Sequence, residues 1–155
     1  MSVAFKWRKS KGSKAERELI HMFWKKGFAA MRAAGSGSTQ LPSPDIVAGN
    51  GKIFLALECK ASHDLVKYLD KDEITQLDLF ANSFGARPFV AIRFDNDRWY
   101  FMRLTDLKAT KKSYVVNFEL AKKKSLSFEE LIGEYKQSRL EDEKTDRAGA
   151  DIKDK

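Results

Sequence analysis

Three ionisable residues stand at the two ends of one short apolar stretch, residues 43–62. Asp45 follows Pro44 at its beginning, and Glu58 and Lys60 come near its end. Carboxylates and ammonium groups are seldom fully buried unless they are paired. Two neighbouring carboxylates repel, and a hard divalent cation between them relieves the repulsion. A nearby lysine can contact an attacking water or a charged phosphorane, so these residue types suffice for metal-assisted phosphodiester hydrolysis.

The spacing predicts a β-hairpin that brings the two carboxylates together. We expect strands over residues 45–48 and 52–60, joined by a type I′ turn with residues 50–51 at its centre. In that register Asp45 and Glu58 are diagonal neighbours, roughly 7–8 Å apart between Cα atoms. A single ion is then within reach of both side chains.

Alternation of side chains along the strands decides which residues share a face. Asp45, Glu58 and Lys60 fall on one face of the hairpin. The opposite face can enter the core, and it carries Ile53, Leu55, Leu57 and Cys59. An ordinary ion pair between Glu58 and Lys60 at a strand end is the alternative to a catalytic role.

The other elements predict an α/β fold with a mixed central sheet flanked by helices. Residues 13–16 have the form of a capping box, which would start a helix that stops at Gly27. A strand over 28–33 and a Gly- and Ser-rich loop over 34–43 follow. The later expected elements are a helix with an Asp70–Glu73 capping box, ending at Gly85, strands over 89–94, 99–104 and 114–118, and a short helix capped by Ser127.

Composition limits the kinds of ligand and compartment. The chain has 155 residues and a net charge of +7, so a nucleic acid is the most common kind of partner for it. One cysteine and two histidines argue against a zinc site built from such ligands, and oxygen ligands favour Mg²⁺ or Mn²⁺. No apolar run approaches the ~20 residues that span a bilayer, so we expect no membrane association. The lone Cys59 fits a reducing compartment, and we expect a cytoplasmic location.

The hairpin matches the P-D-x(n)-[DE]-x-K pattern of the restriction-endonuclease-like nuclease superfamily. A larger arrangement resembles the archaeal Holliday junction resolvases from about residue 10 to residue 135. It consists of GSKAEREL at 12–19, MRAAGS at 31–36, DIVAGNG at 45–51 and ECK at 58–60.

This resemblance implies a restriction-endonuclease-like fold and a homodimeric, Mg²⁺-dependent endonuclease, with Mn²⁺ able to substitute. The enzyme would nick opposing strands of four-way junction DNA in homologous recombination and repair, in association with the nucleoid. By the same resemblance Glu16, Asp45 and Glu58 bind the metal, and the carbonyl of Cys59 is an additional ligand. Lys60 would position or deprotonate water and stabilise the transition state.

The resemblance also assigns residues to DNA handling. Lys14, Arg17 and Arg32 lie at or beside its motif positions, and Ser36 matches a loop serine implicated in catalysis. The loop is longer here than the family pattern, so Ser36 and Ser38 remain alternatives for that serine. From composition and periodicity we expect a basic arm over 1–12, a nuclease domain over 13–135 and a flexible tail over 136–155. Whether a sliding clamp is a partner stays open.

Three functions remain to be separated. The first is the junction endonuclease, the second is another nuclease of the superfamily that cuts duplex DNA, and the third is a non-catalytic DNA-binding module of the same fold. The intact Asp45, Glu58 and Lys60 argue against the third. The run Trp99-Tyr100-Phe101 exceeds what one buried strand face needs, and together with Phe84 it is the expected subunit interface.

Overall fold

The fold is described from a computed structural model of the chain, which covers residues 3–33, 41–95 and 97–134, with side chains from residue 14 onward. Its helices are α1 (Val3–Lys25), α2 (Lys71–Phe84), α3 (Phe118–Lys124) and α4 (Phe128–Leu131), with a 3-10 turn η1 (Leu104–Asp106). Its strands are β1 (Ala29–Arg32), β2 (Ile46–Gly49), β3 (Phe54–Ser62), β4 (Val66–Asp70), β5 (Arg87–Phe94), β6 (Trp99–Arg103), β7 (Lys108–Ala109) and β8 (Ser113–Asn117).

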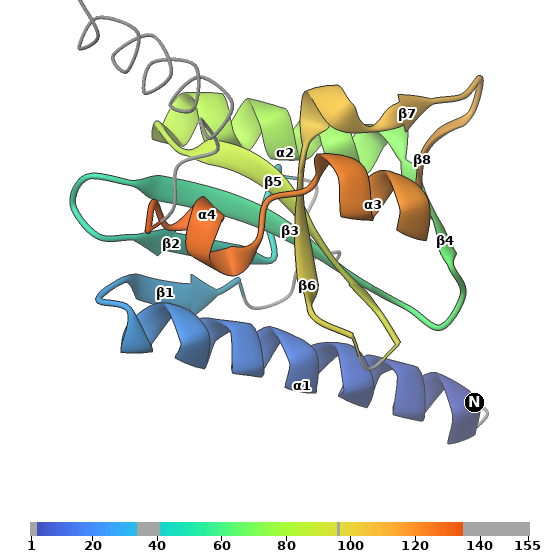
Figure 1. Ribbon diagram of the computed structural model, residues 1–155, viewed down its shortest axis with the longest axis horizontal. Coiled ribbons are helices and arrows are strands. Elements are labelled where there is room, and N and C mark those ends of the chain that lie inside the picture. The colour runs from blue at the N-terminus through green and yellow to red at the C-terminus, as the bar shows by residue number, and fades with distance from the viewer. Residues whose placement is uncertain (1–2, 34–40, 96, 135–155) are drawn as a thin grey trace, which may run out of the picture.

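The main sheet has the strand order β1-β2-β3-β5-β6, and a smaller sheet has the order β4-β8-β7. In the main sheet β3 and β5 are parallel, while the other neighbouring pairs are antiparallel. Helices α1 and α2 lie on opposite sides of this sheet (Figure 1). The expected α/β fold with a mixed, helix-flanked sheet is therefore confirmed. Within the described residues, no helix is long and apolar enough to cross a membrane.

One apolar core lies on each side of the main sheet. The core on the α1 side contains Ala15, Leu19, Phe23, Leu55, Leu57, Trp99, Phe101 and Phe128. The core on the α2 side contains Ala56, Ile74, Leu77, Val90, Ile92, Tyr100, Met102 and Val116. Successive residues of β3 and β6 alternate between these two cores, because side chains alternate along a strand.

The first helix begins ten residues earlier than expected. Because α1 runs continuously from Val3 to Lys25, Ser13 lies in its interior and does not cap it. No proline interrupts residues 3–12, and a glycine such as Gly12 costs a helix interior only about 1 kcal/mol. The expected start of this helix at Ser13 is therefore wrong, while the division into an arm over 1–12 and a domain over 13–135 stays a prediction. Gly27 does adopt the left-handed conformation (φ 81°) after the helix, as expected.

The hairpin forms with its register shifted by two residues. Val47 pairs with Ala56, so the loop has four residues, 50–53, and no two-residue type I′ turn. The carboxamide of Asn50 accepts hydrogen bonds from the N–H groups of Lys52 (2.9 Å) and Ile53 (2.7 Å), which closes this longer loop. A shift by an even number leaves every side chain on its expected face.

The aromatic run of β6 is internal, so its assignment to a subunit interface is wrong. Trp99, Tyr100 and Phe101 have exposed fractions of 6%, 3% and 0%. Trp99 and Phe101 enter the α1-side core, and Tyr100 enters the α2-side core. The ring of Tyr100 meets Phe118 of α3 at 5.9 Å between centroids. Neither α3 nor β4 was expected, and with α3 in place both faces of β6 are covered.

Candidate active site

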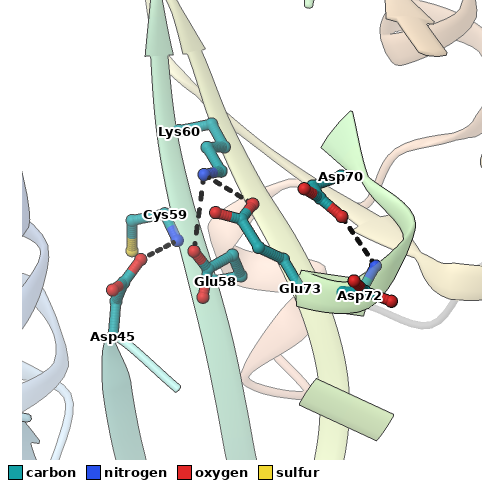
Figure 2. A network of polar contacts seen from close by, with 7 residues as sticks. All are labelled: Asp45, Glu58, Cys59, Lys60, Asp70, Asp72 and Glu73. Carbon is teal, nitrogen blue, oxygen red and sulfur yellow. Dashed lines mark hydrogen bonds and ion pairs between the residues drawn. The ribbon is translucent and has the colours of Figure 1, made fainter. Parts of the chain in front are cut away.

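The site lies where β2 leaves β3. Their pairing ends at Ile46 and Leu57, and Pro44, which has no N–H to donate to a strand partner, stands just beyond. Here the Asp45 side chain replaces the missing strand, since its Oδ2 accepts a hydrogen bond from the Cys59 N–H at 2.8 Å (Figure 2). The Asp45 N–H still donates to the Leu57 carbonyl at 2.9 Å. Asp45 is thereby held at the edge of β3, beside Glu58.

Glu58 and Glu16 both respond to the Asp45 charge. Burial, then the charge of Asp45, raises the pKa of Glu58 from its ordinary value to about 8. Burial and the same charge also raise the pKa of Glu16, which comes from α1. The Asp45 charge thus disfavours ionisation of both Glu58 and Glu16, and a hard divalent cation among such carboxylate oxygens relieves this repulsion. The donor set therefore fits Mg²⁺ or Mn²⁺.

The carboxylates are neighbours but are not arranged as a finished metal site. Among the described residues no group of three His, Cys, Asp or Glu side chains has metal-binding geometry. Glu16 is instead engaged through Oε2 by Nε of Arg32, which comes from β1. The structure thus brings Glu16 within electrostatic reach of Asp45 and Lys60, while Arg32 neutralises part of its charge.

Lys60 is bracketed by two carboxylates. Its Nζ lies 3.5 Å from Oε1 of Glu58 and 2.8 Å from Oε2 of Glu73 (Figure 2). Burial lowers the pKa of Lys60, but the hydrogen bond to Glu73 and the surrounding carboxylate charges outweigh it and leave that pKa above its ordinary value. The ion pair with Glu58, which the sequence offered as the alternative to a catalytic role, exists, and the shorter contact is to Glu73.

Glu73 is the site residue that sequence reasoning missed. Asp70 caps α2 by accepting from the Asp72 N–H at 2.8 Å, as expected. Glu73 was expected to complete a capping box by reaching back to Asp70, but its carboxylate reaches Lys60 instead. The signal that could have found it is tertiary, because α2 covers the sheet face that carries Glu58 and Lys60.

Cys59 turns its side chain away from this cluster. It packs against the α1-side core, as alternation along β3 predicts. Burial, then the nearby carboxylate charges, raises the pKa of the thiol well above its ordinary value, so it stays protonated and is a poor metal ligand. A role for its carbonyl as a ligand stays a prediction.

The residues expected to handle DNA have different surroundings. Lys14 and Arg17 are exposed on α1, and the structure assigns them no role. Arg32 is brought to the site by its ion pair with Glu16. Ser36 and Ser38 lie outside the described residues, as does the tail over 136–155.

Comparison with known proteins identifies the family. The family described as archaeal Holliday junction resolvase (Hjc) matches residues 7–140. The crossover junction endodeoxyribonuclease Hjc of Archaeoglobus fulgidus is 43% identical over 133 residues, covering 81% of this chain and 98% of that protein. Its namesake in Methanocaldococcus jannaschii is 37% identical over 132 residues, covering 85% of this chain and 94% of that protein.

A solved structure agrees with these relatives. The Archaeoglobus fulgidus Hjc, described as a Holliday junction resolvase from an archaeal hyperthermophile, superimposes with a TM-score of 0.73 at 40% identity. The match covers 78% of this chain and 98% of that one. The fork between β2 and β3, with its carboxylates and lysine, is therefore carried on a known resolvase fold, and the chain belongs to the archaeal Holliday junction resolvase family.

Proposed function

We infer that this chain is an endonuclease that resolves four-way DNA junctions by metal-dependent hydrolysis of phosphodiester bonds. The observation that carries this function is the cluster of Asp45, Glu58 and Lys60 at the fork, within a fold shared with junction resolvases. Paired nicks on opposing strands would return a recombination intermediate to two duplexes. Such a substrate puts the enzyme at chromosomal DNA, in association with the nucleoid.

The cation proposed here is Mg²⁺, with Mn²⁺ as a substitute. Asp45, Glu58 and Glu16 would hold it, and the Cys59 carbonyl is an additional candidate. A bound divalent cation supplies Lewis-acid activation of the phosphate and lowers the pKa of a bound water. In support, burial and the Asp45 charge raise the Glu58 pKa to about 8, so Glu58 would release its proton on binding a cation at neutral pH.

The chain's own groups have separate tasks. Lys60 stays an ammonium, because the carboxylates around it raise its pKa. It therefore acts by stabilising negative charge that develops on the phosphate, and a role as general base is disfavoured. Arg32 balances the charge of Glu16 and holds that carboxylate beside the fork.

DNA contacts are proposed on the α1 side of the site. Lys14 and Arg17 are exposed on α1 and would contact phosphates, together with Arg32 and one of the loop serines, Ser36 or Ser38. The net charge of +7 supports binding that is strong at low salt and indifferent to base sequence.

Homodimerisation is the proposed assembly, because two equivalent strands of a junction call for two equivalent sites. With the β6 aromatics buried, the candidate surface moves to α2. Phe84 is 59% exposed and stacks on Phe80 at 5.3 Å between ring centroids, and Leu79 is 56% exposed. Light scattering should give twice the mass of 17.7 kDa. Phe84→Asp should return the mass to that of one chain, whereas a dimer that survives this change would exclude the α2 surface.

One assay tests the function directly. A synthetic four-way junction and linear duplexes with the same arm sequences are incubated with the protein and Mg²⁺. Paired nicks in the junction, with the duplexes left intact, are the expected result. Equal cutting of the duplexes would assign the chain to a different nuclease activity, and binding without cutting would leave a non-catalytic module.

A further inference from the structure

We propose that Glu73 is a positioning residue that fixes the ammonium of Lys60 in the active site; this rests on the proposed function. Lys60 Nζ is 2.8 Å from Oε2 of Glu73 and 3.5 Å from Oε1 of Glu58. The nearer partner of the lysine thus comes from α2, outside the hairpin that carries Asp45, Glu58 and Lys60 (Figure 2).

The helix provides a rigid support for this carboxylate. Glu73 is in the first turn of α2, whose start is fixed by the Asp70 cap and whose end is fixed by Gly85 in the left-handed conformation. Ile74, next to Glu73, is buried against the α2-side core. The position of Glu73 relative to β3 is therefore set by core packing.

Lys60 needs such a partner for two reasons. A lysine ammonium sits on a flexible four-carbon stem, so an unrestrained side chain samples many positions. Its other partner, Glu58, is also a proposed ligand of the cation, and a carboxylate that binds a cation is less available to a lysine. Glu73 has no such competing task among the described contacts, so it can keep Lys60 in place throughout the reaction.

The matched pair of variants is Glu73→Gln and Asp72→Asn. Each removes one negative charge from the first turn of α2, and only Glu73 contacts Lys60. With saturating protein and Mg²⁺, Glu73→Gln should slow single-turnover cleavage of a four-way junction by about 10–100-fold, the usual cost of losing a group that orients an active-site residue. Junction affinity in chelator should not change. Asp72→Asn should cleave at the wild-type rate, and Glu73→Asp should recover part of the loss.

A second readout does not depend on cleavage. In metal-free protein, nuclear magnetic resonance relaxation of the labelled Lys60 side chain should show greater mobility in Glu73→Gln, with no change in Asp72→Asn. Unchanged mobility, or a cleavage rate equal to wild type, would overturn the positioning role. If the wild-type protein does not cut junctions, the proposed function fails, while the mobility comparison still decides whether Glu73 fixes Lys60.

Discussion

The two halves of β3 have different surroundings. Leu55, Ala56 and Leu57 are buried between the two cores and have β2 on one edge and β5 on the other. From Glu58 to Lys60 the pairing with β5 continues, but β2 has ended. One edge of the second half is therefore open to side chains, and Asp45 occupies it through the Cys59 N–H.

This difference shows how one strand can hold both a core and a reactive site. The first half is fixed by backbone pairing and apolar packing. The second half keeps β5 as a strand partner, which holds it rigid, and has the Asp45 carboxylate in place of β2 on its other edge. Charged side chains can therefore lie close together on a strand that is still part of the sheet. Loss of a side chain should therefore affect stability in the first half and chemistry in the second.

The largest expected effect is in the second half. Asp45→Asn and Glu58→Gln keep the shape of the site but remove charge from the proposed cation ligands. Cleavage of a four-way junction should fall by ~10²- to 10⁴-fold, while junction binding persists. Gel-shift and single-turnover assays measure both. Asp64→Asn, at an exposed position just past β3, is the control and should cut at the wild-type rate. A wild-type rate for Glu58→Gln would show that Glu58 is not a ligand of the cation.

In the first half, Leu57→Ala should lower the free energy of unfolding by about 2–5 kcal/mol, because a buried side chain is replaced by a cavity. Leu57 has an exposed fraction of 0% and lies one residue before Glu58. Chemical denaturation measures the loss, and the cleavage rate of the folded fraction should remain normal. Phe54→Ala, at the partly exposed start of the same strand, should cost less. An equal loss of stability in Phe54→Ala and Leu57→Ala would mean that burial does not determine how much each residue contributes to stability.

The pH dependence of stability should also distinguish Glu58, in the second half, from Leu57, in the first. In metal-free protein the Glu58 pKa is about 8, above its ordinary value, so the folded state holds a proton that the unfolded chain has lost. Stability should therefore fall as the pH rises from about 4.5 to 8, by at most a few kcal/mol. Glu58→Gln should flatten this slope in urea titrations at several pH values, and Leu57→Ala should leave the slope as it is.

The smallest effect is expected at the far end of the hairpin. Asn50→Ala removes the acceptor for two loop N–H groups and should cost roughly 0.5–1.5 kcal/mol of stability. Thermal melting measures it, and the cleavage rate should not change. Slower cleavage would show that the register of this loop affects how Asp45 and Glu58 are placed at the other end of the hairpin.

Sequence reasoning predicted the shared face of Asp45, Glu58 and Lys60, because alternation along a strand is unaffected by an even shift of register. It did not predict the register itself, since the Asn50 side chain closes a longer loop. The burial of the β6 aromatics was not predicted because α3 and the small sheet help to cover them. These elements are short segments whose hydrophobic periodicity is weak. Glu73 could not be recognised because its partner is thirteen residues away and is reached only through tertiary packing.

The parallel pairing of β3 with β5 also orders the assembly of the enzyme. Glu16, Asp45, Glu58, Lys60 and Glu73 all precede β5, which begins at Arg87. In a chain made from its N-terminus, these groups emerge before the strand that supports the second half of β3, and pairing across an intervening helix is a slow, non-local step of folding. The candidate site therefore gains its full strand support only once β5, which follows all five of these residues in the chain, has paired with β3.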